Sequence, residues 1–334
     1  MTSWGTMKPS WTTSASVALL LLAAQLASVG AAAQQLEPLA MSYVPGNAIA
    51  WDLDVAMDRG LLKAEGFDGR PVVFQNAPQS AQMLISGEVQ LGTGQIDPFL
   101  LAFRSGARDL AVIAAPAERP DWFLNVRPEI KSVADLKGKF VATAALQVGE
   151  SWLTAKWLDE QGLKAQDWSL LVVGTSALKY AALQRGSVAA AIMFQPLALE
   201  AQLAGFPTMY RFLEGRPFPP VLYVVNRRWA AEKERGRRLS RAIVEAHKWL
   251  LDPANRGEAI AILRRYTKRD MPVMEAVYDL FIAKDKLYSA DAAVDPAGVD
   301  AEVATMIEKG VLPGGTRMRP QDYMLPREQG GLYR

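Results

Sequence analysis

One segment of the sequence occurs twice, and this repeat constrains the fold more than any other feature. LISGEVQLGTGQIDP, which starts at Leu84, matches LQRGSVAAAIMFQP, which starts at Leu183. The two copies share a glycine and an apolar run, and Pro98 aligns with Pro196 after a gap of one residue. Each copy is typical of a helix end, a glycine stop, a buried strand, a polar loop and a proline in the first turn of the next helix. We therefore expect two lobes built on one plan.

The same order of strands and helices surrounds both copies. In the first unit, strands are predicted at 39–43, 71–74, 89–92 and 109–115, with helices at 49–59 and 80–86. In the second unit, strands are predicted at 139–143, 168–173, 188–193 and 208–212, with helices at 132–136, 151–161, 176–185 and 197–203. This alternation predicts α/β lobes with parallel, doubly wound sheets. After a strand at 221–225 the chain is mostly helical, and 313–334 is predicted to be a loosely packed tail.

The N-terminus has the pattern of a secretory signal. Lys8 lies in a short polar region, an apolar run follows at 17–29, and small residues lead to Ala33. The apolar run is shorter than the roughly 20 residues that span a bilayer. We expect cleavage after Ala33 and export to a periplasm, without a lipid anchor because no cysteine follows the apolar run.

Composition excludes several kinds of chemistry. The chain has no cysteine and one histidine, His247, so disulfides, cysteine nucleophiles and thiolate metal sites are excluded. The formal net charge of +2 gives no field for nucleic acid or an anionic membrane. Gly92-Thr93-Gly94 is only half of a dinucleotide fingerprint. We expect no metal, no cofactor, no catalytic residues and no nucleic-acid partner.

Ligands of open parallel sheets bind beyond the carboxyl ends of the strands. Four predicted loops lie there, at 44–48, 93–97, 144–151 and 194–195, two from each lobe. Three of them lead into helix starts, where free N–H groups favour an anionic or hydrogen-bond-accepting ligand group. A ligand site between the lobes is therefore expected.

The candidate ligand-binding residues are side chains and glycines of these loops and aromatic residues beside them. They are Gly46, Asn47, Trp51, Gly94, Gln95, Asp97, Trp122, Gln147, Val148, Gly149, Glu150, Ser151, Phe194 and Gln195. Two interpretations of Glu150 stay open: a first-turn carboxylate that stabilises its helix, or a ligand contact that accepts from an amino group or ring N–H.

Several segments together resemble the solute-binding proteins of bacterial ABC importers in the nitrate, sulfonate and taurine group (SsuA/TauA/NMT1-like), which includes binders of thiamine-pyrimidine precursors. They are AMDRGLLKAEGF, LISGEVQLG, PEIKSVADLKGKFVAT, WLDEQGL and AALQRGSVAAAIMFQP. The resemblance covers roughly residues 38–312. It implies a type II periplasmic-binding-protein fold with two crossovers as a hinge, and delivery of a small solute to a permease with a separate ATPase. We expect the two hinge connections near 115–122 and 217–222.

Carried over to this sequence, the resemblance places the ligand loops on Gly46 and Asn47, on 94–97, on 147–151, and on Phe194 and Gln195. It implies lobe 1 at 34–118 plus 222–312, lobe 2 at 119–221, the tail at 313–334 and a monomer. Glu150 departs from the neutral or basic residues that sulfonate and nitrate binders present, which counts against a sulfonate.

The alternative function is an enzyme on the same fold, similar to a pyrimidine-precursor synthase. Such a relative uses a cysteine-rich motif and an active-site histidine. The absence of cysteine and the distance of His247 from every candidate loop count against it. The identity and charge of the solute are left open.

Overall fold

The computed structural model describes residues 1–5, 35–44, 46–213 and 218–334. Most of the predicted signal segment, and Pro217 of the second predicted hinge, lie outside the described residues. The chain divides into two units, Met1–Glu37 and Pro38–Arg334, and both sheets lie in the second from Pro38 onward.

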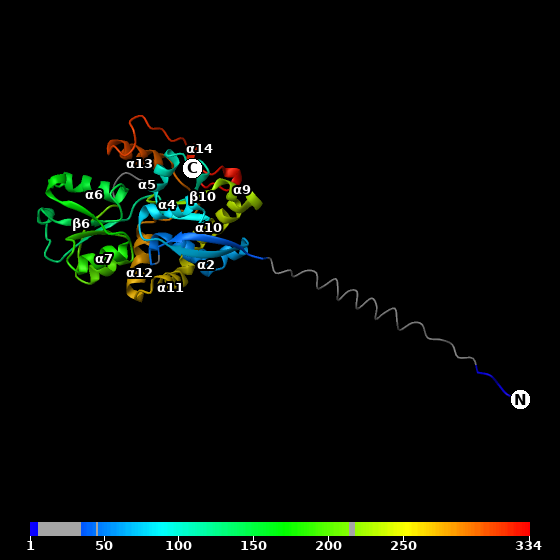
Figure 1. Ribbon diagram of the computed structural model, residues 1–334. Coiled ribbons are helices and arrows are strands. Elements are labelled where there is room, and N and C mark those ends of the chain that lie inside the picture. The colour runs from blue at the N-terminus through cyan, green and yellow to red at the C-terminus, as the bar shows by residue number, and fades with distance from the viewer. Residues whose placement is uncertain (6–34, 45, 214–217) are drawn as a thin grey trace. The chain divides into compact units, whose positions relative to one another are not determined.

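Two five-stranded sheets define two lobes (Figure 1). The sheet of lobe 1 has the order β2 (Phe67–Val73), β1 (Glu37–Tyr43), β3 (Leu91–Gln95), β10 (Val221–Asn226) and β4 (Leu110–Ala114). The sheet of lobe 2 has the order β7 (Ser169–Val172), β6 (Phe140–Thr143), β8 (Ala190–Met193), β5 (Phe123–Val126) and β9 (Thr208–Arg211). The predicted α/β class with two lobes is confirmed.

The sheets are mixed, whereas the sequence predicted parallel ones. β1 pairs parallel with β3, and β6 pairs parallel with β7 and β8. β10 runs antiparallel between β3 and β4, and β5 runs antiparallel between β8 and β9. Each antiparallel strand is the first strand after the chain changes sheets, β5 after β4 and β10 after β9, so each enters its sheet from the opposite direction.

Helices cover the sheets, and Figure 1 shows α6 and α7 on either side of β6. Lobe 1 before the first passage has η1 (Ala48–Ala50), α2 (Trp51–Asp58), α3 (Leu61–Ala64), α4 (Ala77–Ser86) and α5 (Ile96–Arg104). Lobe 2 has η2 (Val133–Leu136), α6 (Gly149–Glu160), η3 (Ala165–Asp167), α7 (Ser176–Gln184) and α8 (Leu197–Leu203). The helices after β10 are α9 (Arg227–Ala231), η4 (Glu232–Glu234), α10 (Arg235–Leu251), η5 (Pro253–Asn255), α11 (Arg256–Thr267), α12 (Met271–Tyr278), η6 (Asp279–Lys284), α13 (Pro296–Glu308), α14 (Pro320–Tyr323) and η7 (Arg327–Gln329).

Local sequence explains how these elements start and stop. Asn76 caps α4 by accepting from the Gln79 N–H, Pro78 lies in the first turn, and Gly87 ends the helix at φ +80°. Every residue of β3 is buried, as expected for a strand covered on both faces. β3 reaches Gln95 and α5 begins at Ile96, so the predicted loop at 93–97 is a direct strand-to-helix junction.

The prediction of a loosely packed tail at 313–334 is wrong. Tyr323 and Leu325 have no exposed surface. The Leu325 N–H donates to the carbonyl of Val112 on β4 at 2.8 Å, and the Leu332 N–H donates to Ile113 at 2.8 Å. β4 is the edge strand of its sheet, so the tail covers backbone groups that would otherwise be unpaired.

Candidate functional site

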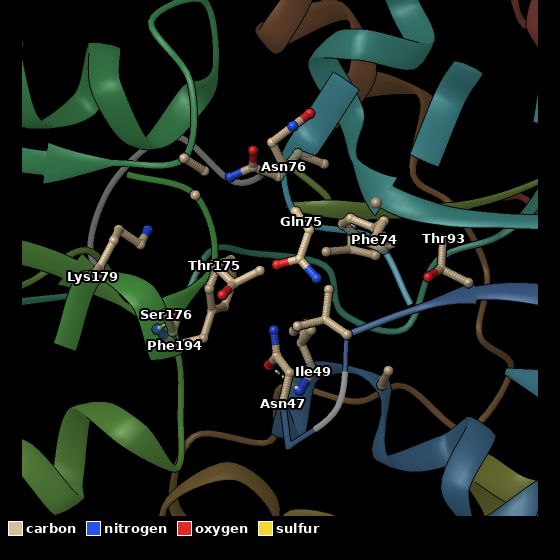
Figure 2. A pocket seen from close by; sticks show the side chains of 17 residues that line it. Asn47, Ile49, Phe74, Gln75, Asn76, Thr93, Thr175, Ser176, Lys179 and Phe194 are labelled. Carbon is tan, nitrogen blue, oxygen red and sulfur yellow. Dashed lines mark hydrogen bonds between the residues drawn. The ribbon is translucent and has the colours of Figure 1, made fainter. Parts of the chain in front are cut away.

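A pocket lies between the two lobes, with about 640 Å³ of space free of protein atoms, including its opening to solvent. Figure 2 shows side chains from both lobes around it. Its lining is Val44, Asn47, Ile49, Ala50, Phe74, Gln75, Asn76, Thr93, Gly94, Gln95 and Val221 of lobe 1 with Ala144, Gly174, Thr175, Ser176, Lys179 and Phe194 of lobe 2. An adjoining pocket shares part of this lining and adds Gly46 and Gln195. The pocket is therefore built from strand ends of both sheets.

Four of the candidate residues line the main pocket: Asn47, Gly94, Gln95 and Phe194. The Asn47 side-chain oxygen accepts from the Ile49 N–H at 3.0 Å and caps η1. Its amide group extends toward the centre of the pocket in Figure 2. Loop geometry thus fixes Asn47 in place while leaving its NH2 group toward the cavity.

The loops after β1 and β8 bond directly to each other. The Ala48 N–H donates to the Gln195 carbonyl at 2.9 Å, across the two lobes. The Gln195 side chain accepts from the Leu199 N–H at 3.1 Å, so it holds the first turn of α8. Gln195 and Gly46 both line the adjoining pocket, and Gly46 has a positive φ of +74°.

Glu150 lies in the first turn of α6 and is fully buried. Its Oε1 accepts from Thr143 Oγ1 at 2.8 Å and from Lys179 Nζ at 2.9 Å, and from the backbone N–H of Ala144. Its Oε2 accepts from Gln95 Nε2 at 3.2 Å, a bond between the lobes. Glu150 is not among the residues that line the pocket, and its oxygens are occupied by protein donors.

Asp97, in the first turn of α5, caps a helix of the other lobe. Its Oδ2 accepts from the Gly149 N–H at 3.0 Å, and Val148, the N-cap residue of α6, makes no side-chain cap. Burial raises the pKa of the Asp97 carboxyl, while hydrogen bonds with Glu302 and Gly149 oppose that rise. Asp97 therefore joins the lobes beside the pocket, without lining it.

The two tryptophans expected to stack on a ligand lie in the core. Trp51 has no exposed surface, and its Nε1 donates to the Ala259 carbonyl at 3.1 Å. Trp122 packs edge-on against Phe194 and Phe218, with ring centroids 6.0 and 5.9 Å apart. Trp122 thus supports the ring of Phe194, which lines the pocket.

The remaining candidates at 147–151 do not line the pocket between the lobes. Gln147 and Val148 line a groove formed with α4 and α5. Ser151 Oγ donates to the Ala145 carbonyl at 2.6 Å. A Cβ at Gly149 would lie 3.1 Å from the Phe218 and Trp122 rings, so the glycine permits close packing there.

The sequence reasoning missed the loops after the second strand of each unit. Phe74, Gln75 and Asn76 follow β2, and the run 174–176 follows β7. Gly174 has φ +106°, and a Cβ there would lie 2.7 Å from the Gln75 carbonyl oxygen, so these loops touch across the lobes. The signal was available, because the strand-end argument applies to β2 and β7 as much as to their neighbours.

Lys179 was also missed. Its side chain is 1% exposed and its Nζ lies 2.9 and 3.2 Å from the two Glu150 oxygens. It lines the pocket from the first turns of α7, whose N-cap residue Thr175 makes no side-chain cap. Backbone N–H groups at this helix start thus remain available to a ligand acceptor.

The described residues contain neither a cluster of metal-ligating side chains nor a helix that could span a membrane. Within 1–5, 35–44, 46–213 and 218–334, no three His, Cys, Asp or Glu side chains gather closely enough for a metal ion. None of the helices in the same residues combines the length and apolarity needed to cross a membrane.

The two sheets and the pocket between them define the periplasmic binding protein fold. The chain matches the NMT1-like family over residues 32–264, more than half of its length, and it belongs to that family. No curated protein matches the chain.

Three solved structures have a similar fold. The alkanesulfonate-binding protein SsuA from Xanthomonas axonopodis pv. citri, bound to MOPS, is 22% identical, with a TM-score of 0.68 over 83% of this chain and 94% of its own. The periplasmic nitrate-binding protein NrtA from Synechocystis PCC 6803 is 16% identical, with a TM-score of 0.70 over 84% of each chain. The desulfurization enzyme DSZB is 16% identical, with a TM-score of 0.64 over 88% of this chain and 97% of its own.

Proposed function

We propose that this protein is the solute-binding component of an ABC-type importer, which captures a small solute between its lobes and delivers it to a membrane permease. The observation that carries the proposal is the interlobe pocket, lined by polar side chains from strand ends of both sheets. Membership of the NMT1-like family and the likeness to SsuA and NrtA support it.

The enzyme alternative has weaker support. The likeness to DSZB concerns the fold, and a fold hosts many functions. The chain has no cysteine, and both ring nitrogens of His247 are occupied, by the Ser289 carbonyl at 2.6 Å and Asp52 at 3.0 Å. An enzyme of this kind needs a nucleophile with a base beside it, and no hydrogen-bonded pair of that kind occurs among the described residues that line the pocket.

We further infer export to a periplasm after cleavage behind Ala33, and lobes that close about the two connections near 115–122 and 217–222. The chain changes sheets between β4 and β5 and again between β9 and β10, so a rotation of the lobes would be absorbed by few backbone dihedrals. Mass spectrometry of the exported protein tests the cleavage. An unchanged radius of gyration at saturating solute would contradict the closure.

Thermal shift against a metabolite panel tests the binding function. A solute at 100 times its Kd adds about 2.7 kcal/mol of stability, which raises the Tm of a unit of roughly 300 residues by about 4 °C. Thr175→Trp fills the pocket and is the matched control, expected to lose the shift. Conversion of a bound solute into a defined product would overturn the proposal.

A further inference from the structure

The Glu150 carboxylate controls the orientation of Gln95. A carboxylate only accepts hydrogen bonds, so the Gln95 side chain must turn its NH2 group toward Glu150, at 3.2 Å. The reverse orientation would place the amide oxygen against a carboxylate oxygen. Lys179, Thr143 and the Ala144 N–H hold Glu150 from the other side, so this orientation is fixed.

The Gln95 amide oxygen is left as a buried acceptor. Gln95 is 7% exposed and lines the pocket, and its Oε1 has no hydrogen-bond partner among the described residues. A buried acceptor without a donor is costly, and a hydrogen bond from a bound solute would remove that cost. An anion would instead bring lone pairs toward Oε1.

Among the described residues, the pocket lining also carries no free charge. Lys179 is the single charged residue among the seventeen that line it, and its ammonium is bonded to both Glu150 oxygens. The described residues that line the adjoining pocket are all uncharged. Because the buried pair is neutral as a whole, an anionic solute would meet no counter-ion among the described lining residues.

We propose that the solute is an uncharged polar molecule that donates an N–H or O–H to Gln95 Oε1. This rests on the proposed binding function and names its ligand class. Lys179 and Glu150 are positioning residues that fix which end of the Gln95 amide stays free to accept. At the other side of the pocket, the α7 N-terminus with Thr175 and Ser176 suits a carbonyl or ring-nitrogen acceptor. The site therefore fits a solute with a donor and an acceptor, such as an amide or an amino-substituted heterocycle.

Calorimetric titration tests the proposal with two sets of probes. The uncharged set is nicotinamide, cytosine and urea, and the anionic set is nitrate, methanesulfonate and ethanesulfonate. We expect binding from the uncharged set, weakened about 10-fold or more by Gln95→Met, because the solute donor then loses its acceptor. Gln82→Met, at an exposed glutamine of α4 outside both pockets, is the matched control and should leave the Kd unchanged.

A second variant keeps the test decisive if Gln95→Met does not fold. In the double variant Glu150→Gln/Lys179→Met, no carboxylate dictates the Gln95 orientation, and the preference for uncharged probes should shrink. The inference would be overturned if anions bound the wild type as tightly as the uncharged probes, or if the Kd were unchanged in both variants. Either result would leave the proposed binding function standing. No binding from either set, with no shift in the metabolite panel, would overturn the proposed function and this inference with it.

Discussion

Replacing Lys179 by methionine removes the ammonium from a carboxylate that has no contact with solvent. Breaking a buried ion pair by removing one partner costs about 3–5 kcal/mol. Glu150 keeps Thr143, Ala144 and Gln95 as donors in this variant, so we expect the lower end of that range. Glu150→Gln leaves the Lys179 ammonium without a carboxylate, so we expect the upper end.

Differential scanning calorimetry measures both losses. At about 2.1 cal/mol/K per residue, a unit of roughly 300 residues loses about 1.6 °C of Tm per kcal/mol. Lys179→Met should therefore lower the Tm by about 5 °C and Glu150→Gln by about 8 °C. The double variant Glu150→Gln/Lys179→Met removes both charges and should lose clearly less than the sum.

An exposed ion pair on α6, the helix that carries Glu150, is the control. Lys156 and Glu160 lie 3.9 Å apart with more than half of each side chain exposed. Lys156→Met should change the free energy of unfolding by at most about 0.5 kcal/mol. The assignment of a buried, coupled pair would be refuted if the double variant lost as much stability as the two single variants together. It would also be refuted if Lys179→Met lost as little stability as Lys156→Met.

Three further outcomes are expected. Asp97→Ala removes the cap of α6 from the other lobe and should cost about 1 kcal/mol, with faster hydrogen exchange at the Gly149 amide; unchanged exchange would contradict the cap. Gly149→Ala brings a Cβ to 3.1 Å from two aromatic rings and should cost about 1–3 kcal/mol, whereas Gly257→Ala, with open space around it in α11, should stabilise the protein in thermal melts. Burial raises the pKa of Asp121 from its ordinary 3.8 to about 6, so the folded state binds that proton more tightly and stability should fall as the pH rises through about 6. Asp121→Asn should flatten this part of the Tm–pH curve, and a curve as steep as wild type would contradict the assignment.

The repeat allowed the lobes to be predicted because strand and helix periods are local signals. The two antiparallel strands were not predictable in that way, since their direction depends on how the chain re-enters each sheet. Residues 313–334 were predicted to be loosely packed because the segment is rich in glycine, proline and arginine. Their packing depends on backbone hydrogen bonds to β4, more than 200 residues earlier, as in Leu325 to Val112.

In the pocket too, some residues were predictable from local sequence and others depend on contacts with distant parts of the chain. Asn47 and Gln95 could be proposed from loop position alone. Lys179 could not, because a lysine in SALKYAALQ matches an exposed helix position. Its burial depends on Glu150, which α6 brings beside α7 from another part of the chain. Glu150 itself satisfies the helix-dipole rule, yet that rule says nothing about the side of the helix on which its partner lies.

The contacts between the lobes follow from the repeat. In the alignment of the two units, β1, β2 and β3 correspond to β6, β7 and β8, and both sheets place these strands in the same order. The loop after β1 bonds to the loop after β8, through Ala48 and Gln195. Exchanging the units turns this contact into one between the regions after β6 and β3, where Glu150 meets Gln95. Because β2 corresponds to β7, exchanging the units maps the contact between the loops after these two strands onto itself. Such reciprocal pairs are what a two-fold relation between similar units produces, so the repeat in the sequence accounts for a pocket lined by matching strand ends of both lobes.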